Sequence, residues 1–402
     1  MEQQGLSRKQ LLGMAAAGAG ALVLGPGLPR AYADGDATYA DGDATAGAAE
    51  AQALVDEAVD WYDVSQWGVE GRGWSDTARF YDRLPARAQA SVRPVIWNLS
   101  RNSAGMATRF RTDATAVYVR YTLRSTSLAL PHMPATGVSG IDLYARDEAT
   151  GRDRWAAVVK PAARTVETAL LTGIDPGMRQ FTAYLPLYNG VDSLEFGVPA
   201  GSAFRPVTPR ERRPVIIYGS SIAQGACASR PGMAFSAILG RRFDRPVINL
   251  GFSGNAFMEP EVGALLAELD PEVFVVDALP NMEADLVAER GEPLIRQLRA
   301  ARPETPVVMA EDRTYANAWL SAGLRERQAA SRAAYREAYR SLLTSGVQRL
   351  IYLAGEDQLG SDDEATTDGS HPSDLGMVRY ADAYTQVLQR VLHPDVPAPA
   401  GS

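Results

Sequence analysis

The chain has one cysteine, three histidines and no surplus of positive charge, and each scarcity narrows the possible classes of protein. Cys227 alone can form no intrachain disulfide, and we expect it to be a small packed residue without a nucleophilic role. The net charge of −8 provides no basic surface, which argues against nucleic-acid binding. Arginine outnumbers lysine 38 to 2, a bias that indicates high-GC coding and not a binding surface.

The first 33 residues have the order of an export signal. A charged segment, Ser7 to Leu12, leads into an apolar segment, Leu11 to Gly25, and Ala31-Tyr-Ala33 is a small-x-small cleavage site. The apolar segment is shorter than the ~20 residues that span a bilayer, which favours a cleaved signal over an uncleaved anchor. Arg8-Lys9 resembles a twin-arginine signal with lysine in the second place. We predict a signal peptide over 1–33, secretion, and no stable membrane insertion after cleavage.

The residues around and after this site repeat without an apolar pattern. Tyr32–Thr38 and Tyr39–Thr45 have the same acidic, glycine-containing sequence. Such a segment cannot bury a core, so we predict that 34–52 is a disordered leader. Its Asp-Gly-Asp triplets could suggest calcium, but a calcium loop needs further ligands that end in a glutamate.

The length of 402 residues exceeds the ~100–200 of a typical domain, which indicates two domains. In 53–203, short runs of strand-forming residues alternate with turn residues, which predicts an all-β sandwich or jelly roll. The segment from Gly201 to Arg213 is proline- and arginine-rich, and we expect it to be a stiff linker. The expected strands are Val95–Trp97, Ala107–Arg111, Ala116–Leu123, Gly140–Ala145, Trp155–Val159, Gln180–Leu185 and Ser193–Val198.

Aromatic residues are concentrated in this strand-rich domain. Its five tryptophans can either stack on sugars or fill the core, and the sequence leaves both alternatives open. His132, with a proline on either side, is expected to be a loop residue without a chemical role. The tryptophans are Trp61, Trp67, Trp74, Trp97 and Trp155.

In 204–395, strands alternate with helices, which predicts an α/β domain with a parallel, doubly wound sheet. The expected strands are Val215–Tyr218, Pro246–Leu250, Val273–Val276, Pro306–Ala310 and Arg349–Leu353. The expected helices are Gly232–Arg242, Pro260–Leu269, Ala284–Ala301, Leu324–Thr344 and Ser373–Leu392.

A serine pair follows the first of these strands. Val215–Tyr218 is apolar and ends at Gly219, so Ser220 and Ser221 lie at the carboxyl edge of the sheet. Ligands bind at that edge in open α/β sheets, which places a serine there as a candidate nucleophile. The alternative is an ordinary polar turn.

A histidine that could activate the serine lies 150 residues later. Asp368 precedes His371 by three positions in a turn-rich loop. A serine hydroxyl needs a base to remove its proton, and imidazole works best when a carboxylate fixes its tautomer. The pair alone could equally be a loop hydrogen bond, but with the corner serine it predicts a catalytic triad.

Together, these motifs resemble the SGNH (GDSL-type) hydrolase superfamily. The blocks of that family appear in family order, at Gly219-Ser-Ser-Ile222, Gly254, Asn281 and Asp368-x-x-His371. Two departures put the subfamily in doubt: Ser220 replaces the aspartate of the first block, and only the asparagine of the third block remains. Gly140-Ile-Asp-Leu-Tyr144 matches the Gly-x-Asp-Leu-Tyr signature of an amino-terminal domain found in one branch of the family.

The resemblance implies a flavodoxin-like hydrolase domain that cleaves carboxylic esters without metal or cofactor. Ser221 would be the nucleophile, His371 the base and then the acid, and Asp368 its orienter. The amides of Ser221 and Gly254 and the side chain of Asn281 would form the oxyanion hole, although Asn281 could also be a plain turn residue. The carbohydrate-active members of the family make short-chain, acetyl-type esters on a sugar or polysaccharide the leading substrate class. The alternatives are acyl transfer with the same triad, or a non-catalytic carbohydrate-binding protein.

One further residue lies at the same sheet edge. Arg313 follows the fourth strand of the domain and could hold a polar or anionic part of the substrate. It could equally pair with Glu311 or Asp312. The sequence indicates neither an oligomeric state nor a macromolecular partner.

Overall fold

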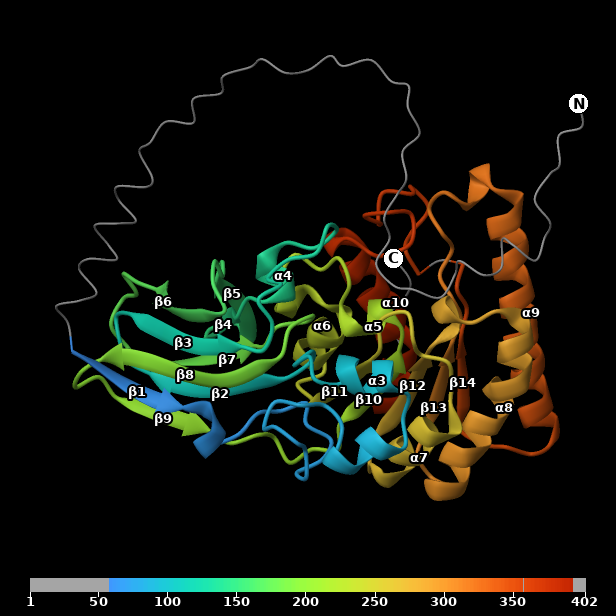
Figure 1. The fold of residues 1–402 in the computed structure, drawn as a ribbon, viewed down its shortest axis with the longest axis horizontal. Helices are drawn as coiled ribbons and strands as arrows, with labels where there is room; N and C mark the ends of the chain where they lie inside the picture. Colours follow the sequence, from blue (N-terminus) through green and yellow to red (C-terminus); the bar gives the residue numbers. More distant parts are fainter. Residues whose placement is uncertain (1–57, 357, 393–402) are drawn as a thin grey trace, which may run out of the picture. The chain divides into compact units, whose positions relative to one another are not determined.

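The computed structural model describes residues 58–356 and 358–392 (Figure 1). The predicted signal peptide (1–33) and the predicted leader (34–52) therefore lie outside the described residues. The described residues all belong to one compact unit. Every helix within them is too short or too polar to cross a membrane.

The amino-terminal part is built from two antiparallel sheets. One has the strand order β1-β8-β3-β6 and the other β5-β4-β7-β2-β9. Apolar residues that alternate along the strands, such as Phe110, Val119 and Phe196, face inward and form one buried core. The strands are β1 (Val59–Asp63), β2 (Ala107–Thr112), β3 (Val117–Leu123), β4 (Asp142–Asp147), β5 (Arg152–Val158), β6 (Thr165–Leu171), β7 (Arg179–Tyr184), β8 (Val191–Pro199) and β9 (Phe204–Val207).

Short helices connect these strands, and one of them corrects a prediction. Val95–Trp97 was expected to be a strand but lies in the helix α3 (Pro94–Leu99). Pro94 stands in the first turn, where its fixed φ suits a helix and its missing amide is not needed. The other short helices are η1 (Val64–Gln66), η2 (Ala86–Ala90) and α4 (Ala135–Val138).

The expected linker also contains structure. β9 lies within Gly201–Arg213 and pairs antiparallel with β2, as in the pair Arg111 and Arg205. The β-sandwich therefore continues past Ala203, because its edge needs this strand to complete the ladder of β2.

The carboxyl-terminal part is a parallel sheet with the order β11-β10-β12-β13-β14, and its predicted strands are all present. This order is that of a flavodoxin-like doubly wound fold, whose switch point lies between β10 and β12. The strands are β10 (Val215–Gly219), β11 (Val247–Gly251), β12 (Val273–Asp277), β13 (Val307–Ala310) and β14 (Leu350–Leu353).

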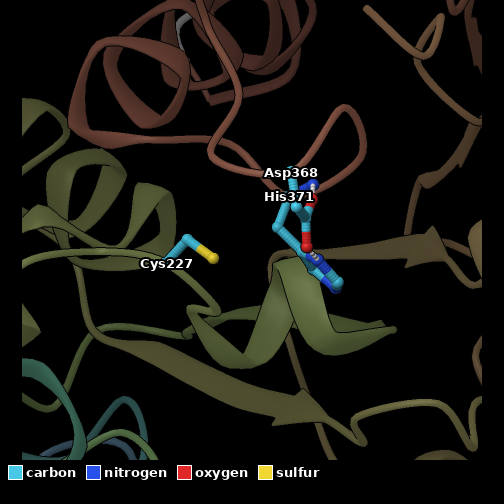
Figure 2. A group of neighbouring side chains, drawn as sticks. All are labelled: Cys227, Asp368 and His371. Atoms are coloured by element: carbon cyan, nitrogen blue, oxygen red, sulfur yellow. Dashed lines mark hydrogen bonds and ion pairs between the residues drawn. The ribbon is translucent and has the colours of Figure 1, made fainter. Parts of the chain in front are cut away.

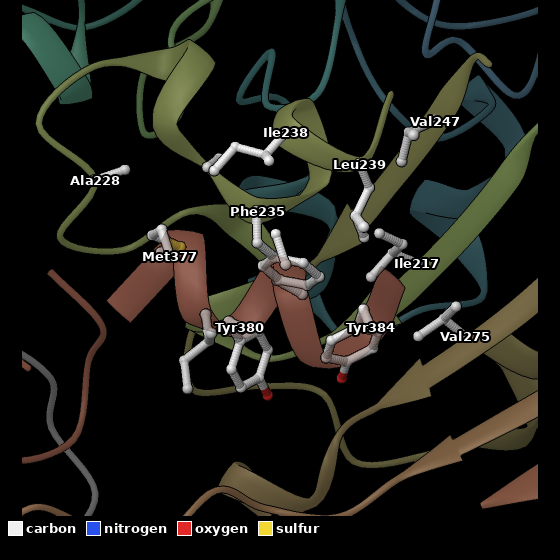
Figure 3. Close-up of a cluster of buried hydrophobic side chains, with 14 of the residues drawn as sticks. Ile217, Ala228, Phe235, Ile238, Leu239, Val247, Val275, Met377, Tyr380 and Tyr384 are labelled. Atoms are coloured by element: carbon white, nitrogen blue, oxygen red, sulfur yellow. The ribbon is translucent and has the colours of Figure 1, made fainter. Parts of the chain in front are cut away.

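Both faces of this sheet are buried, which explains why its strands are continuously apolar. Ile217 and Val275 point to one face, where they pack against α6 and α10, and Figure 3 shows Phe235 and Tyr380 in this cluster. Neighbouring residues point to the other face, which α7, α8 and α9 cover. The helices are α5 (Ser221–Gln224), η3 (Pro231–Met233), α6 (Phe235–Arg242), α7 (Pro260–Glu268), η4 (Leu279–Asn281), α8 (Ala284–Ala301), η5 (Ala318–Leu320), α9 (Ala322–Thr344) and α10 (Asp374–Leu392).

Candidate active site

The corner after β10 presents Ser221 at the first position of the short helix α5. Ser220 caps this helix, since its hydroxyl accepts a hydrogen bond from the Ile222 amide at 3.3 Å. Gly219 ends the strand because a Cβ there would stand 2.5 Å from the carbonyl oxygen of Asp277. The tight turn therefore places the Ser221 hydroxyl at the carboxyl edge of the sheet, beside the switch point.

Ser221, His371 and Asp368 form a continuous hydrogen-bonded relay. Ser221 Oγ lies 2.9 Å from His371 Nε2, and His371 Nδ1 lies 2.7 Å from Asp368 Oδ2. A carboxylate only accepts hydrogen bonds, so Nδ1 carries the proton and Nε2 is left to accept the serine proton. The structure thus brings together the three residues that the sequence predicted as a triad.

The loop that carries the histidine is folded around its own aspartate. Asp368 Oδ1 accepts hydrogen bonds from the amides of Ser370 at 3.0 Å and His371 at 2.8 Å. Burial acts to raise the pKa of Asp368, but these amides and the imidazole outweigh it and lower the pKa. Asp368 therefore stays ionised and can stabilise an imidazolium on His371.

Gly254 and Asn281 also lie in loops at the carboxyl edge. Gly254 is exposed with φ +67°, in a turn closed by the Asn255 amide and the Phe252 carbonyl. Asn281 Oδ1 accepts a hydrogen bond from the Ala256 amide at 3.3 Å, which leaves Nδ2 to donate. Among the described residues, the amides of Ser221 and Gly254 have no acceptor, so both can donate to a ligand.

Known protein families match both parts of the chain. A model of the GDSL-like lipase/acylhydrolase family matches residues 212–389, and a model of the amino-terminal region of SGNH-hydrolase-type esterases matches residues 59–204. A protein described as a GDSL-like lipase from Bacteroides ovatus is 30% identical, with a TM-score of 0.80, over 83% of this chain and 98% of that one. The chain belongs to the GDSL-like lipase/acylhydrolase family. It is an esterase of the SGNH type.

More distant structures share the fold of this esterase. A salicylyl-acyltransferase from a tetracycline biosynthetic pathway is 17% identical, with a TM-score of 0.66, over 85% of this chain and 99% of that one. A family two carbohydrate esterase from Cellvibrio japonicus is 12% identical, with a TM-score of 0.55, over 84% of this chain and 98% of that one. No curated protein matches the chain.

Arg313 of the esterase is a structural residue, and the alternative as a substrate contact is wrong. Its side chain is 1% exposed and forms an ion pair with Asp312. Its Nε and Nη2 donate to the carbonyl oxygen of Ser370 at 3.0 and 2.8 Å. Because Ser370 directly precedes His371, the guanidinium fixes the loop that carries His371, and its burial removes it from the surface of the site.

The loop after β11 carries three bulky apolar residues, Phe252, Phe257 and Met258, and two of them belong to the core. Phe252 and Met258 are 0% and 2% exposed and pack beneath the sheet. Phe257 stacks under the guanidinium of Arg93, 4.7 Å from its ring centroid. Phe252 and Met258 are therefore unavailable as walls for an acyl chain.

Cys227 lies beside the relay (Figure 2). Within the described part of the chain, Cys227, Asp368 and His371 form the group of side chains that could share a metal ion, with ligand atoms within 4.8 Å of one another. Burial raises the pKa of the Cys227 thiol to about 11, so it stays protonated near neutral pH. A protonated thiol is a weak ligand and nucleophile, which supports the packed role expected for it.

The β-sandwich also contacts the nucleophile corner, which sequence reasoning missed. Tyr188 donates from its hydroxyl to the carbonyl oxygen of Ser221 at 3.3 Å. Gln224 of α5 donates to the carbonyl oxygen of Leu187 at 3.1 Å. Arg83, which is 1% exposed, donates to the carbonyl oxygen of Gly251 at the end of β11 at 2.7 Å. No periodic pattern marks these residues, since their partners are up to 168 positions away.

The Gly-x-Asp-Leu-Tyr signature forms a second contact between the two parts. Asp142 is fully buried, and its carboxylate accepts hydrogen bonds from Arg230 at 2.9 Å, the Gly232 amide at 2.7 Å and the Trp155 indole at 3.0 Å. Ser229, next to Arg230, donates from its amide to Asp374 at the start of α10, at 2.9 Å. The signature therefore anchors the loop before α6, and that loop in turn contacts the start of α10, the helix that follows His371.

The tryptophans do not share one role. Trp97 is 6% exposed and belongs to the core, as one alternative predicted, whereas Trp155 is 52% exposed. Trp155 lies under the guanidinium of Arg230, 5.2 Å from its ring centroid, at the contact with the hydrolase part.

Proposed function

We propose that the protein is an exported serine esterase that removes short acyl groups, above all acetyl, from carbohydrate. The observation that carries this proposal is the relay from Ser221 through His371 to Asp368 at 2.9 and 2.7 Å. A serine that donates to an oriented neutral imidazole has the arrangement required of an activated nucleophile.

The proposed reaction has two steps. Ser221 Oγ attacks the ester carbonyl while His371 Nε2 takes its proton, and the oxyanion accepts hydrogen bonds from the amides of Ser221 and Gly254 and from Asn281 Nδ2. His371 then gives the proton to the leaving alcohol, and an acyl-enzyme remains. Water, deprotonated by His371, attacks the acyl-enzyme and releases the acid.

Two observations support the substrate class. The fold matches that of carbohydrate esterases, among them the one from Cellvibrio japonicus. Phe252 and Met258, in the loop after β11, are buried in the core and cannot line a trough for a long acyl chain. An acetylated sugar or polysaccharide meets both conditions.

The alternative function is acyl transfer to a second alcohol, and one structural similarity favours it. The salicylyl-acyltransferase shares the fold over nearly the whole chain, and transfer would use the same relay. Product analysis with an added alcohol distinguishes the two: transfer gives a new ester, and hydrolysis gives only the acid.

We also propose, from the sequence, where the chain is cleaved on export and where its two domains divide. A signal peptide over 1–33 would be removed, and a leader over 34–52 would follow. The boundary predicted between 203 and 204 would move past Val207, so that β9 stays with the β-sandwich. Amino-terminal sequencing of protein collected from the medium tests the cleavage site.

A fluorophosphonate probe tests the nucleophile. Wild type should be labelled and Ser221→Ala should not. Cys227→Ser is the matched control, because it changes the other potential nucleophile beside the relay and should still be labelled. An unlabelled wild type, or equal labelling of Ser221→Ala, would overturn the proposal.

A further inference from the structure

A polar cavity lies on the outer face of the sheet β5-β4-β7-β2-β9, where the hydrolase part covers it. Residues alternate between the faces of a strand, so Arg109 and Arg111 of β2 share one face with Gln180 and Thr182 of β7. They are direct cross-strand neighbours, Arg109 opposite Thr182 and Arg111 opposite Gln180. The opposite face, with Phe110 and Phe181, forms the sandwich core.

The hydrolase part closes this face only partly. Ala237 of α6 packs on the sheet against Tyr144 and Tyr184. Farther along, Arg241 and Asp244 at the end of α6 line a cavity of about 290 Å³. That volume is near the lower end of the ~300–1,000 Å³ of small-molecule sites and suits one sugar ring.

The lining carries more guanidinium groups than carboxylates. Five arginines border the cavity, and three of them pair with Glu70, Asp153 or Asp244. Within the described residues, Arg111 and Arg241 have no carboxylate within 4 Å. The bordering arginines are Arg109, Arg111, Arg146, Arg210 and Arg241.

Two of these side chains hold buried nitrogens without an acceptor. Arg241 Nη1 and Arg109 Nε are both buried and donate no hydrogen bond within the described residues. Arg241 is held in place by its Nη2, which donates to the carbonyl oxygen of Gly232 at 2.7 Å, and by Tyr144, whose ring centroid is 4.2 Å from the guanidinium. Arg241 is therefore a fixed guanidinium in the wall of the cavity, and a fixed guanidinium is suited to an oxyanion.

We infer that this cavity is a non-catalytic binding site for an acidic sugar, a monosaccharide unit that carries a carboxylate. The guanidiniums of Arg111 and Arg241, which have no carboxylate partner among the described residues, bind the carboxylate. Glu148 and Asp153 accept hydrogen bonds from the hydroxyls of the ring. This mixture of donors and acceptors distinguishes a polyol site from a simple anion site.

The site is separate from the relay. Arg210 precedes β10 and Ser221 follows it, so they lie beyond opposite ends of this strand, which is about 16 Å long. An acidic polysaccharide held here would keep the esterase on its substrate between cleavages. This inference rests on the proposed function for its biological meaning but not for its test.

The test is a calorimetric titration of the full chain with sodium D-glucuronate. D-glucose and sodium sulfate are the comparison ligands. Glucuronate should bind, glucose should bind at least about tenfold more weakly, and sulfate should bind more weakly than glucuronate. Arg111→Gln should weaken glucuronate binding about tenfold, because it removes one charge-assisted hydrogen bond.

Arg152→Gln is the matched control. Arg152 is also an exposed arginine of this sheet, but it points to the face opposite to Asp153, so glucuronate binding should not change. Both variants should keep wild-type turnover of p-nitrophenyl acetate, which separates this site from the catalytic one. Failure of the esterase proposal would show in fluorophosphonate labelling and would leave glucuronate binding intact.

Three results would overturn the inference. Glucuronate could show no binding up to about 20 mM, which is about 20-fold above a Kd of ~1 mM. Arg111→Gln and Arg152→Gln could have equal effects. Sulfate could bind as tightly as glucuronate with the same dependence on Arg111, which would show an anion site without sugar recognition.

Discussion

The imidazole rings of His132 and His371 lie nearly parallel, with 5.8 Å between their centroids and an interplanar angle of 28°. His132 is exposed and comes from the β-sandwich, whereas His371 is the base of the relay. The expectation that His132 is a loop residue without a chemical role did not foresee this position. An exposed ring beside the base can contact the leaving alcohol of a bound ester.

Replacing His132 should therefore affect large substrates more than small ones. His132→Ala should raise KM for an acetylated polysaccharide about 2- to 10-fold, the effect of one lost hydrogen bond of ~0.5–1.5 kcal/mol. Turnover of p-nitrophenyl acetate should change little, because its leaving group offers no sugar hydroxyls. Steady-state kinetics on both substrates measure this, and an equal loss on both would contradict a role in binding the leaving group.

Asn281→Ala should lower kcat by about 10²–10³ with little change in KM, because an oxyanion donor acts mainly in the transition state. Asn255→Ala is the control, since its side chain contacts Arg93 and the carbonyl oxygen of Ser253. Steady-state kinetics with p-nitrophenyl acetate compare the two. A loss in Asn255→Ala without one in Asn281→Ala would show that the third block is wrongly placed.

The acyl chain should be short. Each methylene that is removed from water contributes ~0.8 kcal/mol, but Phe252 and Met258 are buried in the core and cannot cover a chain. We expect kcat/KM to fall steeply from acetyl to octanoyl p-nitrophenyl esters. A flat or rising series would point to an apolar wall supplied by other residues.

Asp277 should make stability depend on pH. It is fully buried at the end of β12, its backbone carbonyl oxygen accepts a hydrogen bond from the Ser220 amide at 3.1 Å, and Tyr380 donates to its carboxylate at 3.1 Å. Burial raises the pKa of Asp277 to about 7. The folded chain thus holds a proton that the unfolded chain releases near the ordinary aspartate pKa of 3.8, so this group stabilises the fold at low pH.

That stabilisation should be lost as the pH rises from about 4 through 7, by at most ~1.4 kcal/mol per pH unit. Asp277→Asn keeps an acceptor for Tyr380 but does not titrate. Its free energy of unfolding, measured with urea at pH 5 and pH 8, should therefore change less than that of wild type. Parallel pH dependences of the two proteins would contradict the assignment.

Much of the hydrolase part could be predicted because its signals are local. The apolar strands are buried on both faces and therefore read as continuous runs, and Ser221 and Asp368-x-x-His371 stand at turns that their own residues define. α3 was mistaken for a strand because Val95, Ile96 and Trp97 are strand formers, and the effect of Pro94 on the first turn outweighed them.

Long-range contacts could not be predicted in the same way. Nothing near Arg313 in the sequence shows that its guanidinium holds Ser370, 57 residues later. Tyr188 and Arg83 likewise act on backbone carbonyls, which carry no sequence signal. Whether an arginine contacts substrate or forms a structural ion pair depends on the fold around it. The sequence alone therefore left both alternatives open for Arg313.

Tyr188 donates a hydrogen bond to the backbone carbonyl oxygen of Ser221. Asp142 accepts a hydrogen bond from the Gly232 amide in the loop before α6. The two halves are therefore not interchangeable modules. A hydrolase part joined to a foreign β-sandwich would keep its triad residues. It would lose the Tyr188 hydroxyl that contacts Ser221 and the Asp142 carboxylate that pairs with Arg230. Exchange of domains among relatives would have to carry these anchors along, so the two halves are expected to be inherited together.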